Sequence, residues 1–158
     1  MRIVIVRHSQ SIDNITRTIS GSETPLSDLG REQAKSFGQN ILKMGIRFDA
    51  VYSSTFPRAS ETAIIICNEI GFKDIILEAR FREGVADDYT GKCVDDLTKE
   101  EKELFDSYLV NVDEKPVGGE SITEQRMRHT EAFFEVAENH PETSTILIVG
   151  HVGRYTTF

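Results

Sequence analysis

The strongest constraint on the fold is the regular alternation of short apolar runs with longer amphipathic stretches along the chain. The apolar runs are rich in isoleucine and valine, which is typical of strands. The stretches between them place apolar residues three or four positions apart, as helices do. This order favours an α/β fold with a mostly parallel sheet covered on both faces. The expected strands span residues 3–6, 48–53, 75–77 and 145–149, and the expected helices span 28–44, 57–70 and 98–108. A last helix is expected to begin at Ser121 and to be closed by Pro141.

Local signals mark where these helices begin and end. Ser27 is a suitable N-cap for the first helix, and Gly45 follows it as a stop. Pro57 suits the first turn of the next helix, and Gly71 closes that helix. Ser121 opens a Ser-Ile-Thr-Glu stretch with the spacing of a capping box. Each boundary therefore has a physical reason that is independent of the apolar pattern.

Charged side chains follow the predicted strands where ligands usually bind. Residues 3–6 lack polar alternation, so we expect a strand buried on both faces, and Arg7 and His8 follow it directly. Arg58 comes shortly after the second strand, and His151 follows the last. Ligands of parallel sheets bind beyond the carboxyl ends of the strands, and guanidinium groups bind phosphate bidentately. The pattern therefore predicts an anion site, with His8 as a nucleophile in a phosphate pocket.

The bulk composition excludes several classes of protein. The net charge is −8, from 18 Lys and Arg against 26 Asp and Glu, which argues against nucleic acid or an anionic membrane as a partner. No apolar stretch approaches the 18 residues of a membrane span. Cys67 and Cys93 form neither a disulfide framework nor a metal knuckle, which fits a reducing compartment. We therefore expect a soluble, cytoplasmic protein.

Residues 84–119 differ from the rest of the chain. They hold ten acidic residues against four lysines, a net charge of −6, and their apolar periodicity is weak. Long segments of this kind often form lids over a site. We expect residues 1–158 to form one domain, with 84–119 as a lid or excursion.

Two other chemistries compete with a phosphate pocket. A pair of histidines can bind a metal ion, but metal sites need further ligands and Arg7 beside His8 would repel a cation. A serine nucleophile lacks the Gly-x-Ser-x-Gly elbow that usually carries it. We therefore expect neither a metal nor another cofactor.

Five motifs, in order, resemble those of the histidine phosphatase superfamily, in its phosphoglycerate-mutase-like branch. The resemblance spans nearly the whole chain. Its motifs are Arg7-His8-Ser9 with Asn14, Gly21 and Leu26–Gly30; Ser53-Ser54 with Arg58-Ala59 and Thr62-Ala63; Phe81-Arg82-Glu83; Gly118–Ser121 with Arg128; and Ile146–His151.

The resemblance implies a three-layer α/β/α sandwich and a phosphohistidine intermediate on His8. Glu83 would be the general acid, although Glu78 at the end of the third strand is a local rival. Such chemistry depends mainly on positioning and charge stabilisation. By resemblance, Arg7, Arg58 and His151 would hold the phosphoryl group, with Asn14, Ser20 and Gly21 helping to line the pocket.

The segment from Glu83 to Glu120 is shorter than in the mutases of this family, which favours hydrolysis of a phosphomonoester. The acidic charge of this segment points to a small phosphorylated substrate that is at most modestly charged. Phosphoryl transfer of the mutase type stays open as an alternative. A catalytically weak phosphate-binding protein of the same fold is a further alternative.

The sequence also departs from the family pattern. Ser9 and Val152 stand where the family usually has glycine, and both add bulk beside the pocket. The sequence reaches only Phe158, whereas family members generally continue with a helix and a strand. We therefore expect the C-terminal elements of the family to be missing and a sheet edge or apolar helix face to be exposed. A second copy of the chain, in a homo-oligomer, is one way to cover it.

Overall fold

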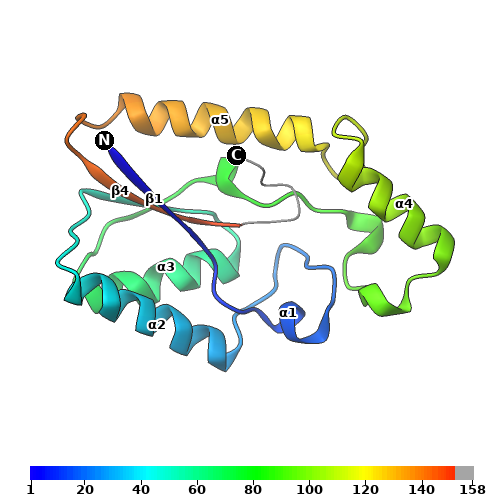
Figure 1. Ribbon diagram of the computed structural model, residues 1–158, viewed down its shortest axis with the longest axis horizontal. Helices are drawn as coiled ribbons and strands as arrows, with labels where there is room; N and C mark the ends of the chain where they lie inside the picture. The colour runs from blue at the N-terminus through cyan, green and yellow to red at the C-terminus, as the bar shows by residue number, and fades with distance from the viewer. Residues whose placement is uncertain (152–158) are drawn as a thin grey trace.

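A parallel sheet forms the centre of the computed structural model, which describes residues 1–151 (Figure 1). Within that part of the chain the sheet has four strands in the order β1-β4-β2-β3. All three pairings are parallel, as the alternation of strands and helices predicts. The strands are β1 (Arg2–Arg7), β2 (Ala50–Ser53), β3 (Ile75–Leu77) and β4 (Thr145–Gly150).

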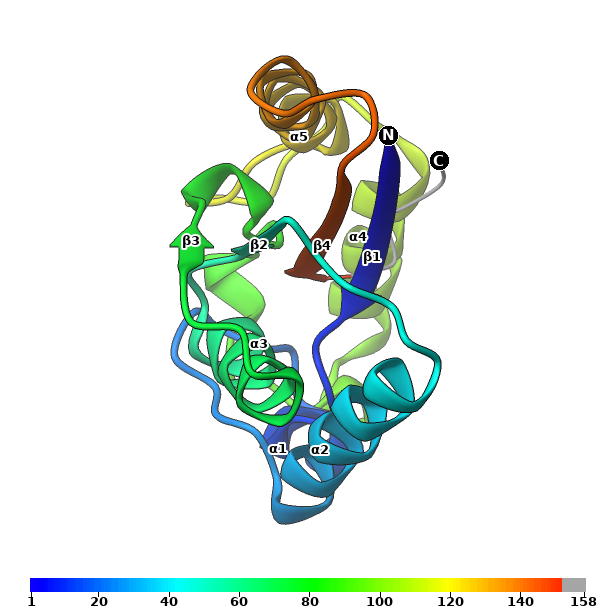
Figure 2. The same cartoon turned by 90° about the vertical axis from the view of Figure 1, so that its left-hand side faces the viewer.

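Helices cover the sheet on both faces, so the fold is an α/β/α sandwich. Figure 2 shows α2 and α3 on one side of the strands and α5 on the other. The helices are α1 (Ile12–Thr16), α2 (Asp28–Lys43), α3 (Pro57–Ile70), α4 (Lys99–Val110) and α5 (Ile122–Glu138).

The predicted helix boundaries are confirmed by their capping contacts. The hydroxyl of Ser27 accepts a hydrogen bond from the backbone N–H of Gly30 at the start of α2. Pro57 occupies the first turn of α3, and Gly71 ends that helix with a φ of 72°, a left-handed conformation that favours glycine. Ser121 forms a full capping box at the start of α5.

Two apolar clusters hold the layers together. The first packs α2 and α3 against the sheet and the second packs α5 against the opposite face. Adjacent residues of one strand enter different clusters because side chains alternate along a strand. Leu147 and Val149 belong to the first cluster, whereas Ile146 and Ile148 belong to the second. The central strand β4 is therefore nearly fully buried, and it fixes the position of His151 at its end.

The expectation that the first strand is buried on both faces is wrong. β1 lies at the edge of the described sheet and pairs only with β4. Val4 and Val6 pack against the cluster under α2 and α3, but Ile3 and Ile5 are 36% and 42% exposed on the face that carries α5. An unbroken apolar run is therefore compatible with an edge strand that packs on one side only.

Residues 84–119, which we call the excursion, contact the loop after α1 through Ile19. The excursion contains two 3₁₀ turns, η2 (Asp87–Tyr89) and η3 (Val94–Asp96), followed by α4. Its own small cluster joins Ala86, Tyr89 and Phe105. The predicted helix near 98–108 is thereby confirmed, with Thr98 as its N-cap. Within the described chain, every helix is too short or too polar to span a lipid bilayer.

Candidate active site

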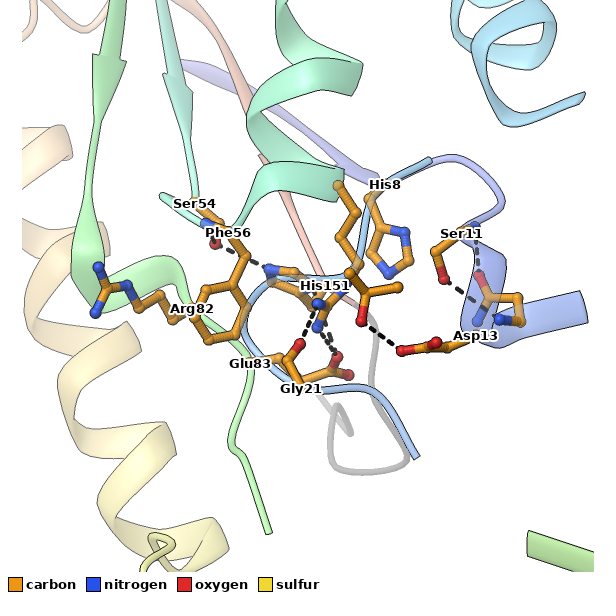
Figure 3. Close-up of polar contacts among 12 residues, drawn as sticks. His8, Ser11, Asp13, Gly21, Ser54, Phe56, Arg82, Glu83 and His151 are labelled. Atoms are coloured by element: carbon orange, nitrogen blue, oxygen red, sulfur yellow. Dashed lines mark hydrogen bonds and ion pairs between the residues drawn. The ribbon is translucent and has the colours of Figure 1, made fainter. Parts of the chain in front are cut away.

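The carboxyl ends of the strands bring the predicted site residues together, as the parallel topology requires. The backbone N–H of His8 donates to the carbonyl of Gly150, 2.8 Å away, so His8 follows β1 beside the end of β4. The rings of His8 and His151 lie 5.1 Å apart, centroid to centroid. Figure 3 shows both rings beside Glu83, which comes from the loop after β3. The predicted convergence of the strand ends is confirmed.

His8 is held as a neutral imidazole with a defined tautomer. Its Nδ1 lies 2.7 Å from the carbonyl oxygen of Ser9. A carbonyl oxygen only accepts hydrogen bonds, so Nδ1 carries the proton and Nε2 keeps its lone pair. Burial, assisted by the positive charges of Arg58 and Arg7, lowers the pKa of His8 to about 4 despite the opposing bond to Ser9. The ring is therefore an uncharged imidazole with a free lone pair on Nε2 at physiological pH.

His151 is also buried and uncharged, with one nitrogen held by a serine. Burial is the main cause that lowers the pKa of His151 to about 2, and nearby Arg58 acts in the same direction. Its Nε2 lies 2.9 Å from the hydroxyl oxygen of Ser54, which itself accepts the backbone N–H of Phe56. Nδ1 lies 3.6 Å from a carboxylate oxygen of Glu83 and has no hydrogen-bond partner among the described residues. A proton on Nδ1 would therefore point toward the carboxylate.

Arg58 provides a buried positive charge beneath the histidines. Arg58 lies in the first turn of α3, and only 1% of the residue is exposed. One terminal nitrogen donates to the carbonyl of Gly21 (2.7 Å) and the other pairs with Glu83 (2.9 Å). Its Nε has no hydrogen-bond partner in the described chain. Buried polar groups are nearly always paired, so this unused donor fits a site built to receive an anion.

Glu83 is positioned by a second arginine from α5. Arg128 donates to the backbone carbonyls of Arg80 and Arg82, at 2.6 and 2.7 Å, and also pairs with Glu120. These bonds fix the loop that carries Glu83 toward the histidines.

The rival acid, Glu78, has a different role. Its side chain accepts the backbone N–H of Arg80 and pairs with the guanidinium of the same residue. It is not among the residues that line the cavities beside Glu83. The geometry therefore favours Glu83.

A cavity of about 480 Å³ opens beside His8. Its lining includes Arg7, which was expected to hold the phosphoryl group, and Asn14 and Ser20, which were expected to help line the pocket. The side-chain oxygen of Asn14 also accepts the backbone N–H of Ser11, within the capping box of α1. Gly21 and Arg58 are not among the residues that line this cavity. The guanidinium of Arg58 donates a hydrogen bond to the backbone carbonyl of Gly21. The volume lies within the usual range for small-molecule sites and exceeds what a phosphoryl group alone requires.

A comparison with known protein families identifies the superfamily of this chain. The profile of the histidine phosphatase superfamily (branch 1) matches residues 3–157. The chain belongs to this superfamily. The resemblance carried by the five motifs is thereby confirmed.

Two curated relatives and two solved structures place this superfamily member more closely. It is 31% identical over 154 residues to the phosphoglycerate mutase-like protein 4 of Arabidopsis thaliana, covering 96% of this chain and 66% of the relative. It is 31% identical to a 2,3-bisphosphoglycerate-dependent phosphoglycerate mutase of Bartonella bacilliformis, with 94% and 75% covered. The chain thus spans about two thirds to three quarters of these relatives' length.

Two solved structures that resemble this chain carry phosphatase names. A mycobacterial glucosyl-3-phosphoglycerate phosphatase superposes with a TM-score of 0.85 at 25% identity, covering 97% of this chain and 74% of the neighbour. The alpha-ribazole phosphatase of Shigella flexneri gives a TM-score of 0.80 at 26% identity, with 98% and 75% covered. The α/β fold of this histidine phosphatase chain is therefore that of its superfamily.

The site of this histidine phosphatase chain suits an anion better than a metal ion. Ligand atoms of His8, Glu83 and His151 lie within 4.8 Å of one another, close enough to surround an ion. However, the Glu83 carboxylate already pairs with Arg58, and the charges of Arg7 and Arg58 act on His8. A divalent cation would sit beside two guanidinium groups, which is electrostatically unfavourable.

Sequence reasoning missed several residues that support this site. Ser54 holds His151, and the Phe56 ring stacks edge-on against that imidazole, 5.4 Å between centroids. The hydroxyl of Thr62 accepts the backbone N–H of Ser9 and so helps to fix the loop at His8. Ser54 and Thr62 lie within the motif that carries the resemblance, but Phe56 has no local signal for its role. The predicted effect of Val152 lies outside the described residues.

Proposed function

We propose that this histidine phosphatase chain hydrolyses phosphomonoesters through a phosphohistidine on His8. The observation that carries the proposal is the orientation of that ring, whose Nδ1 is bonded to the carbonyl of Ser9 while Nε2 keeps a free lone pair beside the cavity. A buried neutral imidazole next to guanidinium groups is suited to attack a phosphorus atom whose oxygens those groups hold.

The first step transfers the phosphoryl group to His8. Nε2 attacks phosphorus and forms the P–N bond while the bond from phosphorus to the leaving oxygen breaks. Arg7, Arg58 and the Nδ1–H of His151 hold the phosphoryl oxygens and offset their charge. A phosphoryl group bound to Arg58 would replace Glu83 on that guanidinium. The carboxyl group would then hold a proton and donate it to the leaving oxygen as that bond breaks, which leaves Glu83 as a carboxylate.

The second step returns His8 to its starting state. Glu83, now a carboxylate, takes a proton from a water molecule as the water oxygen attacks phosphorus. The P–N bond breaks, its electron pair returns to Nε2, and inorganic phosphate leaves. The reaction consumes one water molecule and releases one alcohol and one phosphate. Each step is a single displacement at phosphorus, so the main requirement is to hold the attacking and leaving atoms in the correct geometry.

Hydrolysis is favoured over transfer of the mutase type by the solved neighbours that carry phosphatase names. The curated relatives have mutase names, which support mutase-type transfer as the alternative. These relatives are longer than this chain. Conversion of 3-phosphoglycerate to 2-phosphoglycerate, measured beside release of inorganic phosphate, separates the two reactions. Mutase activity without phosphate release would overturn the proposal.

The decisive experiment is turnover of p-nitrophenyl phosphate by the full chain and by His8→Gln, with His140→Gln as the matched control. His140 bonds the hydroxyl of Tyr52, away from the cavity. We expect loss of activity in the first variant and retention in the second. Protein denatured in alkali during turnover should carry one phosphoryl group on His8, because the P–N bond is stable in base and hydrolyses in acid. Phosphate binding without any turnover would instead support the phosphate-binding alternative.

We propose that the reaction needs no metal ion, because two guanidinium groups supply the positive charge. Activity should persist in a chelator and be inhibited by vanadate; a structure of the mycobacterial neighbour contains VO3. Loss of activity in the chelator, with recovery on adding a divalent cation, would contradict this part of the proposal. Cys67 and Cys93 are both free thiols, in keeping with the cytoplasmic setting that we propose.

A further inference from the structure

The cavity beside His8 has an apolar wall on the side away from the strand ends. The wall comes from two segments that are distant in sequence. Ile19 belongs to the loop after α1, and the other members belong to the excursion over residues 84–119. These are Ala86, Val94 on η3 and Phe105 on α4.

Interactions within the two segments hold the wall in place. The backbone N–H of Ile19 donates to the carbonyl of Lys92, and Gly91 donates back to the carbonyl of Ile19, each at 3.0 Å. The ring of Phe105 packs on that of Tyr89, with centroids 5.1 Å apart, and the residue is only 6% exposed. A pre-formed apolar surface of this kind favours ligands that bury carbon against it.

The same part of the cavity is poorly suited to a second anion. Among the described lining residues, the cations are Arg7, which is next to His8 in the sequence, and Arg17, which pairs with the excursion. Arg17 pairs with Asp95 at 2.9 Å, and the carboxylate of Asp13 also lines the cavity. The positive charge of Arg17 is therefore already paired, and Asp13 adds a carboxylate to the same described lining. A carboxylate or second phosphate on the substrate would find no surplus of positive charge there.

We infer that the substrate is the phosphomonoester of an uncharged alcohol with an apolar body, such as an alkyl chain or an aromatic ring. The inference rests on the proposed function, because it places the ester's phosphoryl group at His8. The apolar body then packs against Ile19, Val94 and Phe105. A phosphorylated acid or a bisphosphate is disfavoured by Asp13 and Asp95.

Binding of alkylphosphonates to the full chain tests this inference without requiring turnover. Methyl-, propyl- and hexylphosphonate carry the same anionic group with increasing apolar length, and calorimetry gives Kd for each. Each methylene that is fully buried should lower Kd by about fourfold. The matching alkyl phosphates should show the same order in kcat/KM, since their leaving oxygens are chemically alike. In this way leaving-group reactivity does not mask the effect of packing.

A charged substitution in the wall provides the matched test. Val94→Lys places an ammonium group in the cavity, whereas Val117→Lys adds the same group at an exposed position of the same excursion. Val94→Lys should abolish the fall in Kd from methylphosphonate to hexylphosphonate, and it should tighten binding of 3-phosphoglycerate. Val117→Lys should change neither. Phe105→Leu keeps an apolar side chain, so it should reduce this fall in Kd without abolishing it.

The outcomes separate this inference from the proposed function. If Kd is the same for all three phosphonates, or if 3-phosphoglycerate is the preferred substrate of the unmodified chain, the inference is overturned while hydrolysis can stand. If Kd falls with length but no ester is turned over, the inference holds and the proposed reaction fails. If neither methylphosphonate nor inorganic phosphate binds, both fail.

Discussion

The burial of two neutral histidines predicts that the protein loses stability in mild acid. His8 and His151 have pKa values of about 4 and about 2 in the folded chain, against 6.5 for the exposed side chain. Between pH 6.5 and 4 the unfolded chain therefore binds protons that the folded chain excludes. Folded-state pKa values that are lowered in this way leave stability intact above pH 6.5 and reduce it as the pH falls.

The size of the effect follows from the shift at His8. A change of one pKa unit corresponds to about 1.36 kcal/mol, so a fall from 6.5 to 4 is worth about 3 kcal/mol in total. About 2 kcal/mol of this is lost between pH 7 and pH 4.5. The loss levels off below pH 4, where the folded chain also protonates His8. Because His151 titrates lower still, it adds a similar slope over the same interval.

The assay is urea denaturation of the unmodified chain and of His8→Asn at several pH values from 4.5 to 7, in phosphate-free buffer. Carboxylates and His151 are common to both proteins, so the difference between the two curves isolates His8. Between pH 7 and pH 4.5 the free energy of unfolding of His8→Asn should fall by about 2 kcal/mol less than that of the unmodified chain. Parallel curves would show that His8 titrates normally, which would refute the argument that it is held neutral by burial.

Three further predictions test the support of the site. Arg128→Met should release the loop that carries Glu83 and lower kcat by about a hundredfold with a smaller change in KM, measured by steady-state kinetics. Gly30→Ala should lower the free energy of unfolding by about 1–3 kcal/mol, because its Cβ would lie 2.1 Å from the carbonyl oxygen of Gln10; urea denaturation measures it. Inorganic phosphate at a hundred times its Kd should raise the free energy of unfolding by about 2.7 kcal/mol, and Arg58→Met should abolish that gain in thermal melts.

The elements that the sequence predicted well are those with local signals at both ends. The helix after Ser27 and the helix after Ser121 begin where a hydroxyl can accept a backbone N–H, and the helix from Pro57 ends at a left-handed glycine. By contrast, the helix over Ile12–Thr16 was missed. It is five residues long, too short for an apolar period, and its capping box uses Asn14 in place of the usual glutamate or glutamine.

Strand order and exposure depended on contacts that no local pattern contains. The run at Ile3–Val6 reads as a buried strand because nothing in it is polar. Its actual exposure depends on which strands lie beside it and which helices reach it, and both are properties of the whole chain. The convergence of His8 with His151 was predictable for the opposite reason, since parallel strands always bring their carboxyl ends to one edge.

The supporting contacts of the site required coordinates. Residue type and motif order indicated Arg58 and Glu83, but their ion pair depends on the path of the loop after β3. That path is fixed by Arg128, which lies 45 positions further along the chain on α5. The role of Ser9 also depends on backbone atoms, because its carbonyl orients His8 and its N–H bonds Thr62. Its side chain, which sequence reasoning expected to add bulk, is not among the groups that line the cavity.

Burial has opposite consequences for the two kinds of basic side chain at this site, and the proposed chemistry depends on that difference. An imidazole gives up its proton when water is excluded, so His8 keeps the free lone pair that the proposed attack on phosphorus requires. A guanidinium keeps its charge inside a protein when a carboxylate partners it, as Glu83 partners Arg58. An anion that displaces Glu83 from Arg58 would therefore meet a fixed positive charge and a neutral nucleophile together. The same exchange would free the carboxyl group beside the leaving oxygen, so that binding of the phosphoryl group itself would prepare the acid.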